Sequence, residues 1–307
     1  MKEAVLLEPK YVPCVWGGQR LMPQDPPIGE AWVVYEQNRV VGGPYAGKTL
    51  EQLVQEQGLA LLGSKVRPGR FPLLVKLLDT ADWLSVQVHP DDAQALALGG
   101  AGQLGKTEAW HILEAAPGAE VICGVRPGTS VDALWAGLGT REMLELVQRV
   151  GVQAGDTVLV EAGTLHALGP GLLLYEVQQT SDITYRIYDW DRPMKAGRAL
   201  HLEQSRQVVN PSAAPLRTPL PEAGRGELTA CPYFRLELLA PRSKGLALHT
   251  RGESFHALTA IDGEASVQGE GWSCALKKFQ TALIPAAVGA YALEASKGFR
   301  ALKATAA

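Results

Sequence analysis

The sequence predicts a mainly β protein built from two jelly-roll-type β-barrel domains with short helical insertions. Its 307 residues include 33 glycines and 20 prolines, which divide the chain into short segments. Between these breaks lie apolar runs of strand length, the pattern of a sandwich or barrel. The length also exceeds the size at which one hydrophobic core usually remains undivided, so two domains are expected.

The predicted strands fall into two groups along the chain. The first group comprises residues 32–35, 73–78, 121–123, 157–160 and 172–175. A stretch rich in Pro, Gly and Ala then separates it from the second group, residues 234–239, 254–261, 265–267 and 281–285. This spacing predicts a first domain over 1–209, a linker over 210–227 and a smaller β domain over 228–307.

Helical periodicity is confined to three segments. Thr49 is an N-cap candidate for a helix over residues 49–62, because apolar residues follow it at helical spacing. A short helix is expected over 92–98. Residues 130–150 are expected to form two helices, broken by the glycines at 137–139.

Composition limits the classes of function. The net charge is −3, which gives no basic face of the kind that nucleic acid requires. No apolar run approaches the roughly 18 residues of a membrane-spanning helix, and the N-terminus does not read as a signal peptide. The four cysteines lack any CxxC spacing, so reduced thiols are expected. We therefore expect a cytoplasmic protein that binds neither nucleic acid nor membrane; whether it is a monomer or homodimer stays open at the level of sequence.

Three segments carry the residue types of a metal site. Residues two apart on a strand share a face, so Gln87 and His89 point together, as do Lys106 and Glu108. In the third segment, residues 155–166, glycines at 155 and 163 make turns that swing His166 inward. The spacing of this segment resembles the second motif of the cupin proteins.

Two imidazoles and one carboxylate, with an amide oxygen nearby, form a ligand set suited to Zn²⁺ with one position left open. An open position is what a catalytic metal needs. The same set also suits Fe²⁺, so the ligands alone do not select between the two ions. A lone histidine is usually structural. That interpretation applies to the remaining four, His111, His201, His249 and His256.

Taken together and in order, these segments resemble the type I mannose-6-phosphate isomerases, in their short bacterial form. The strongest matches are QVHP (87–90), KTE (106–108), GTLHAL (163–168) and TYRIYDW (184–190), and the resemblance runs nearly the whole chain. It implies a cupin fold, one zinc ion per chain and the reversible interconversion of mannose 6-phosphate and fructose 6-phosphate through an enediol.

The resemblance also implies roles for individual residues. Carried over by position, His89, Glu108 and His166 are zinc ligands, Gln87 matches a fourth ligand and Arg186 matches the catalytic arginine. Three departures stand out. Gly105 replaces a histidine of longer members, Glu161 replaces the usual proline of the second cupin motif, and a large helical insertion is missing.

Isomerisation needs a base for the C–H proton, a stabiliser for the oxyanion and a holder for the phosphate. Arg186 can stabilise the oxyanion, although an ion pair with Asp182 or Asp189 is its structural alternative. Ser85, Lys106 and Arg186 are the candidates for binding the phosphosugar, and Lys106 is also a catalytic candidate.

Several questions stay open at the level of sequence. The candidates for the base are Glu30, Glu161 and a zinc-bound water, and none of these is favoured. The second domain lacks a matching His and Glu set, so it is expected to be metal-free. Two other functions fit the same motifs: a cupin oxygenase that uses Fe²⁺, and a non-catalytic sugar-binding or regulatory cupin.

Overall fold

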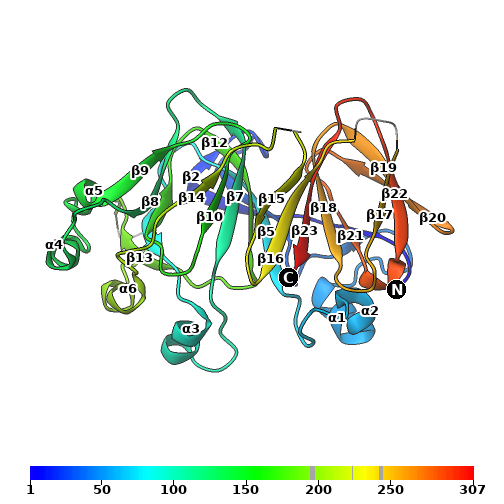
Figure 1. Ribbon diagram of the computed structural model, residues 1–307, viewed down its shortest axis with the longest axis horizontal. Helices are drawn as coiled ribbons and strands as arrows, with labels where there is room; N and C mark the ends of the chain where they lie inside the picture. Colours follow the sequence, from blue (N-terminus) through cyan, green and yellow to red (C-terminus); the bar gives the residue numbers. More distant parts are fainter. Residues whose placement is uncertain (194–197, 223, 242–244) are drawn as a thin grey trace. The chain divides into compact units, whose positions relative to one another are not determined.

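The computed structural model describes residues 1–193, 198–222, 224–241 and 245–307. It is mainly β, as predicted, and its strands form jelly-roll-like pairs of sheets instead of closed barrels (Figure 1). The chain forms two compact units. The first comprises Met1–Tyr11, Ala31–Leu77 and Leu220–Ala307, and the second comprises Val12–Glu30 and Leu78–Pro219.

Two sheets build the first unit. The larger has the order β15 (Gly226–Ala230), β16 (Phe234–Leu239), β23 (Arg300–Ala306), β18 (His256–Asp262), β21 (Thr281–Ile284), β1 (Val5–Leu7) and β4 (Val40–Val41). The smaller has the order β17 (Gly245–His249), β22 (Ala290–Ala295), β19 (Glu264–Gly269) and β20 (Trp272–Lys277). Leu258 and Ile284 of the larger sheet share one buried cluster with Val267 and Leu293 of the smaller, so the two sheets enclose a common core.

Two further sheets carry the strands around the predicted site. One has the order β14 (Leu216–Thr218), β10 (Thr157–Val160), β7 (Glu108–Ala115), β12 (Leu172–Gln179), β5 (Leu73–Asp79), β3 (Ile28–Val34) and β2 (Lys10–Gly18). The other has the order β13 (Tyr185–Tyr188), β6 (Val86–Val88), β11 (His166–Leu168), β8 (Glu120–Val125) and β9 (Val147–Gly151). Trp110 and Leu174 of the first sheet pack with Val121 and Leu168 of the second in one buried cluster.

The outer face of the five-stranded sheet is covered by helices. Val86 and Val88 share a buried cluster with residues of α4 (Val131–Gly137), α5 (Met143–Leu146) and α6 (Leu202–Val208), which lie beside this sheet (Figure 1). Because side chains alternate along a strand, Gln87 points away from these helices and into the space between the two sheets. This alternation is what the sequence predicts for residues 86–89.

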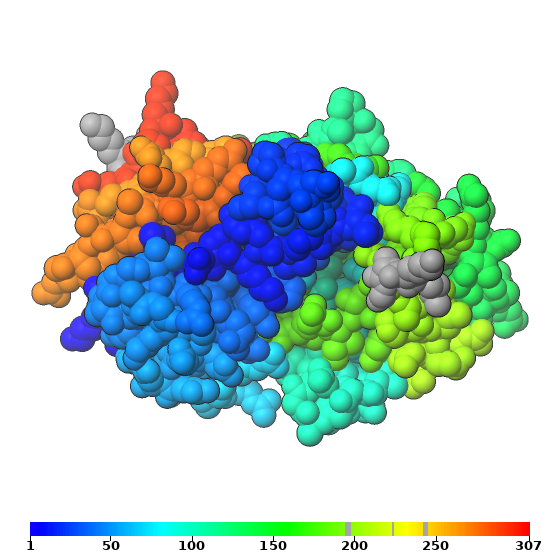
Figure 2. Space-filling view, turned by 180° about the vertical axis from the view of Figure 1, so that it is seen from behind, coloured from blue at the N-terminus to red at the C-terminus, as the bar shows by residue number. Residues whose placement is uncertain are grey.

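The described ranges contain three further α-helices. Thr49 caps α1 (Leu50–Gln57) through a capping box with Gln52, as predicted, and α2 (Leu59–Leu62) follows after Gly58. In the second unit, α3 (Asp92–Gly99) lies against α6, and Gln94 Nε2 donates to the carbonyl of Gln207 at 3.0 Å. In the space-filling view of Figure 2 these two segments, turquoise and yellow-green, lie next to each other. None of the helices in the described ranges has the length and apolar character needed to cross a membrane.

Two expectations change. A helix reaching residue 150 is wrong, because α5 is a single turn and residues 147–151 form β9, which pairs with β8. Part of the expected linker is also ordered, since β14 pairs with β10. The predicted domains 1–209 and 228–307 are consecutive, whereas both compact units combine separate stretches of chain. The domain boundaries and roles stay a prediction.

Candidate functional site

Two facing rows of polar side chains lie inside the second unit. On the five-stranded sheet, Gln87 of β6 lies opposite His166 of β11 on one side and Arg186 of β13 on the other. On the larger sheet, Glu108 of β7 lies opposite Gln178 of β12. Each row would be apolar if this space were only a hydrophobic core, so the rows mark a polar site within it.

Three of the predicted residues converge there. One ligand atom from each of His89, Glu108 and His166 lies within 4.8 Å of the other two. The Glu108 carboxylate is 3.4 Å from His89 Nε2 and 3.5 Å from His166 Nε2, and all three side chains are 1% exposed. Across the described ranges, this is the one group of at least three His, Cys, Asp or Glu side chains that satisfies the 4.8 Å condition.

Local backbone geometry brings these residues together. Gly163 has a φ of +86°, which favours glycine, and its N–H donates to the carbonyl of His89 at 2.8 Å. The turn that ends at Gly163 therefore joins the segments of His89 and His166. Gly105 is required for a different reason, since a Cβ there would lie 2.6 Å from the backbone of Asp91 and Asp92. A histidine at position 105 would therefore require the backbone here to shift.

The orientation of both imidazoles follows from their hydrogen bonds. His89 Nδ1 is 2.8 Å from the carbonyl oxygen of Ile183, and His166 Nδ1 is 2.8 Å from that of Thr164. A carbonyl oxygen only accepts, so each Nδ1 carries the proton and each Nε2 presents its lone pair toward Glu108. This is the tautomer that a metal-ligating histidine adopts.

Burial favours the neutral form of the His166 imidazole. Burial lowers the pKa of His166 to about 4; the hydrogen bond to the carbonyl of Thr164 opposes this shift, the charge of Lys106 adds to it and that of Glu176 opposes it. Burial also raises the pKa of the Cys123 thiol to about 12, and the charge of Glu108 adds to this effect. The imidazole of His166 is therefore neutral at pH 7, with its lone pair available.

Lys106 lies inside the cluster. Its ammonium nitrogen is 2.9 Å from His89 Nε2 and 2.9 Å from Glu108 Oε2. The contact to Glu108 is an ion pair without hydrogen-bond geometry, which leaves Oε2 a buried acceptor with no hydrogen-bond donor. Lys106 precedes β7, which begins at Glu108, so the expected strand starts two residues later than predicted.

Arg186 and Ser85 form a second part of the site. Arg186 Nε donates to Ser85 Oγ at 3.1 Å and Nη1 donates to the carbonyl of Ala199, while Ser85 Oγ donates to Gln87 Oε1 at 3.4 Å. Burial lowers the pKa of Arg186, as does the nearby charge of Arg198. These contacts run from Arg186 through Ser85 to Gln87, the cross-strand neighbour of His166.

The predicted ion pair of Arg186 with Asp182 or Asp189 is not formed within the described part of the chain. Asp189 pairs instead with Arg192 at 3.0 Å and with Arg198 at 2.6 Å. These two arginines satisfy the carboxylate that would otherwise hold Arg186. The Arg186 guanidinium is half-buried beside the cluster, with a hydroxyl and a carbonyl as its side-chain partners.

Sequence reasoning missed Glu176 and Gln178, both on β12. Glu176 is 4% exposed and accepts a hydrogen bond from Trp110 Nε1 at 3.0 Å, and the Trp110 ring packs edge-on against His166. Gln178 is fully buried, and its Oε1 has no hydrogen-bond donor. The signal depends on extending the strand from Tyr175 to Gln179, as in the structure, because a buried charged residue within it has to face a polar space.

The carboxylates proposed as bases lie in different environments. Glu161 is exposed, whereas Glu30 is half-buried in β3. Glu176, by contrast, is buried and lies opposite Trp110 on the strand that carries Glu108. It therefore joins Glu30 and Glu161 as a third candidate among the side chains.

The other histidines make local contacts. His111 Nδ1 is 2.9 Å from Thr157 Oγ1, His201 Nδ1 accepts from the backbone N–H of Arg186, and His249 Nδ1 accepts from that of Arg251. In the first unit, His256 Nδ1 is 2.6 Å from the hydroxyl of Tyr291. These contacts agree with the structural interpretation of all four.

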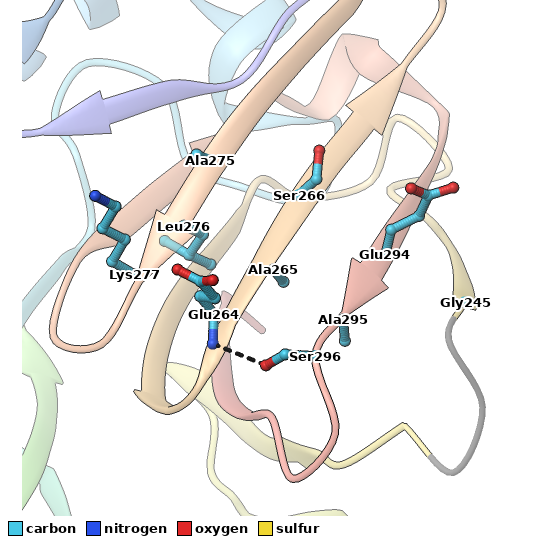
Figure 3. A pocket seen from close by; sticks show the side chains of 10 residues that line it. All are labelled: Gly245, Glu264, Ala265, Ser266, Ala275, Leu276, Lys277, Glu294, Ala295 and Ser296. Atoms are coloured by element: carbon cyan, nitrogen blue, oxygen red, sulfur yellow. Dashed lines mark hydrogen bonds between the residues drawn. The ribbon is translucent and has the colours of Figure 1, made fainter.

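The first unit also carries a pocket, on the sheet of β17, β22, β19 and β20 (Figure 3). It has a volume of about 580 Å³, and its charged lining side chains are Glu264, Lys277 and Glu294. At one end the backbone N–H of Glu264 donates to Ser296 Oγ at 3.2 Å. The lining contains none of the residues predicted for the site, so this pocket and the His–Glu–His cluster are separate features.

Known proteins resemble this chain along most of its length. Residues 17–107 match the family model of the phosphomannose isomerase type I catalytic domain. Mannose-6-phosphate isomerase ManA of Bacillus subtilis is 34% identical over 308 residues, which are 95% of this chain and 96% of that protein. Mannose-6-phosphate isomerase of Streptococcus mutans is 41% identical over 221 residues, 68% of each chain.

Solved structures give the same picture. The crystal structure of mannose 6-phosphate isomerase from Bacillus subtilis has a TM-score of 0.83 at 28% identity and covers 98% of this chain and 99% of that one. The apo form of the Salmonella typhimurium enzyme has a TM-score of 0.79 at 17% identity, with full coverage of both chains, and supports the fold alone. The resemblance seen in the sequence is thereby confirmed: this chain belongs to the type I mannose-6-phosphate isomerase family.

Proposed function

We propose that this protein interconverts mannose 6-phosphate and fructose 6-phosphate by aldose–ketose isomerisation, with a divalent metal, zinc, held by His89, Glu108 and His166. The observation that carries the proposal is the convergence of two imidazoles and a carboxylate beside Arg186 and Lys106. Family membership supports the reaction, and the donor set supports the metal.

The residues present fit such an ion. Both Nε2 atoms offer lone pairs, and Glu108 Oε2 is a buried acceptor that lacks a hydrogen-bond donor. Nitrogen and oxygen donors of this kind suit Zn²⁺ with a position left for another ligand. When bound, the ion supplies Lewis-acid polarisation of the substrate oxygens. Gln87, whose amide lies 3.3 Å from His166 Nε2, stays the proposed fourth ligand.

The chain's own residues then divide the work of isomerisation. The Arg186 guanidinium donates hydrogen bonds to the oxygen on which negative charge develops as the C–H proton is removed and the enediolate forms. Lys106 and Ser85 donate to the anionic phosphosugar. The proton that moves between C1 and C2 requires a carboxylate or another base within reach. Glu176 is a buried carboxylate that lies opposite Trp110, on the strand next to the one that carries Glu108, and it is a candidate for this base.

An assay coupled to the formation of fructose 6-phosphate tests the proposal. Protein stripped with a chelator should lose turnover of mannose 6-phosphate and regain it when one equivalent of Zn²⁺ is added. Binding of mannose 6-phosphate without turnover by the zinc-loaded protein would favour a sugar-binding cupin. Activity that depends on Fe²⁺ and consumes oxygen would favour an oxygenase.

The setting in which the protein works is also a proposal. We infer that it acts on a free small-molecule phosphosugar in the cytoplasm, without nucleic acid or membrane, as a monomer or homodimer. The net charge of −3 supports the expected absence of nucleic-acid binding, because it provides no basic face. Sedimentation of the purified protein measures its oligomeric state.

A further inference from the structure

The ammonium group of Lys106 contacts two of the three residues of the proposed metal cluster, His89 and Glu108. Its nitrogen is 2.9 Å from both His89 Nε2 and Glu108 Oε2, and its side chain is 5% exposed. Two hydrogen bonds hold the backbone at and before Lys106. The N–H of Lys106 donates to the carbonyl of Pro90, and the N–H of the preceding Gly105 donates to Asp92 Oδ1 at 2.8 Å.

The lone pair of His89 admits one partner. Its Nδ1 carries a proton because it donates to the carbonyl of Ile183, so Nε2 has a single lone pair. A lysine ammonium has donors and no acceptor, and Lys106 therefore uses that lone pair for its hydrogen bond. A divalent ion on His89 Nε2 needs the same lone pair. The two cations cannot share it.

Glu108 adds a second reason for competition. Its carboxylate is 1% exposed, and a buried carboxylate requires a compensating charge. Lys106 provides one at 2.9 Å. A divalent ion provides another, and the presence of both would place like charges within a few ångströms in a medium of low dielectric.

We propose that Lys106 is an internal cation that competes with the divalent metal for His89 and Glu108, and that metal binding displaces its ammonium toward the substrate. Lys106 thus keeps the ligands assembled in the metal-free protein, and its release makes a donor available for the anionic phosphosugar. This inference rests on the proposed metal site. It adds an order of events: the metal binds before Lys106 can engage substrate.

The test uses the full chain with Lys106→Met, Lys106→Arg and Lys76→Met. Lys106→Met removes the competing cation, so the affinity for Zn²⁺, measured by competition with a chromogenic chelator, should rise by about tenfold or more. Its metal-free form should melt several degrees lower than the wild type, since Glu108 is left without a counter-charge. With Zn²⁺ bound, the two melting temperatures should converge.

The other two variants separate charge from packing. Lys106→Arg keeps a cation and should retain an affinity close to that of the wild type. Lys76→Met removes another buried lysine, whose ammonium lies 5.1 Å from the Trp32 ring, and should leave Zn²⁺ affinity unchanged whatever its effect on stability. If metal-free Lys106→Met does not fold, this result supports the need of the buried Glu108 for a cation. The Zn²⁺ affinity is then measured on Lys106→Gln.

Three distinguishable outcomes would each refute a different claim: the metal site, the competition, or the counter-charge role of Lys106. A wild type that binds no Zn²⁺ would refute the metal site itself. A wild type that binds Zn²⁺ normally while both Lys106→Met and Lys106→Gln bind it equally or more weakly would refute competition. Equal melting temperatures of the metal-free wild type and Lys106→Met would refute the role of Lys106 as counter-charge.

Discussion

Gln87 Nε2 lies 3.3 Å from His166 Nε2, and the two residues face each other directly across β6 and β11. His166 Nδ1 already donates to the carbonyl of Thr164, so the Gln87 amide must be the donor in this contact. Gln87 therefore presents its N–H, and not its oxygen, to the imidazole. To become a metal ligand, the amide has to rotate so that Oε1 turns toward the centre.

This geometry predicts a modest role for Gln87. Gln87→Ala should still bind one metal ion per chain, because both imidazoles and the carboxylate remain. Its affinity should fall by about tenfold, the size of effect expected for a weak or supporting ligand. Competition with a chelator measures it. A loss of all metal binding would instead make Gln87 an essential ligand.

The histidines offer a matched pair of substitutions. His166→Ala should abolish both stoichiometric zinc and turnover, because it removes a central donor from a site of three. His111→Ala is the control, since His111 is equally buried at 1% exposed and contacts Thr157 instead of the cluster. Metal analysis and the coupled assay should separate the two. Equal zinc content in both variants would contradict the ligand assignment.

Arg186 is predicted to act on substrate and not on the metal. Arg186→Ala should keep a full complement of zinc and lose turnover by about 10²–10³-fold, the usual loss for one oxyanion donor. The reason is its position, because Arg186 contacts Ser85 and the carbonyl of Ala199 and none of the three ligands. Zinc content and kcat are measured on the same sample. Loss of metal would refute this division of roles.

Stability should depend on pH through His256. Burial lowers the pKa of His256 to about 3, below the ordinary value of 6.5. The unfolded chain therefore binds the proton more readily, and stability falls as pH decreases from about 6.5 toward 3, by at most about 1.4 kcal/mol per pH unit. His256→Gln should show a smaller loss between pH 7 and pH 5 in urea denaturation. An unchanged slope would show that His256 does not titrate in this way.

Two adjacent residues test the cost of a left-handed backbone. Arg251 is exposed with a φ of +57°, and Arg251→Gly should stabilise the protein by about 0.5–1 kcal/mol. The neighbouring Gly252 has a φ of +69°, and no atom lies within 4 Å of the position that a Cβ would take there. Gly252→Ala should therefore destabilise by about 1 kcal/mol through backbone strain alone. Urea denaturation measures the change in the free energy of unfolding for both variants. Changes of the same sign would contradict the explanation.

Much of the fold could be predicted because its patterns are local. Alternation over residues 86–89 placed Gln87 on the inner face, and the helices that pack on Val86 and Val88 confirm it. Local periodicity predicts helix up to residue 150, whereas residues 147–151 form β9, because the pairing of β9 with β8 is a long-range contact that local periodicity does not encode. The strand β14 was hidden in a Pro-rich stretch for the same reason.

Some residues of the candidate site could be predicted from the sequence, and others could not. Motif spacing identified His89, Glu108 and His166, whose convergence the structure describes. Glu176 was missed because the apolar run before it reads as a strand that ends at Tyr175, whereas β12 continues to Gln179. The position of Lys106 between two ligands could not be read from spacing, because it depends on the packing of Gly105 against Asp91.

The central claim is that three side chains bind one catalytic metal ion. Anomalous X-ray scattering at the zinc absorption edge, from crystals of zinc-loaded active protein, tests it most directly. One peak per chain is predicted, about 2.0–2.2 Å from His89 Nε2, His166 Nε2 and a carboxylate oxygen of Glu108. A peak bound elsewhere in a fully active crystal, or these three side chains turned away from the ion, would contradict the account.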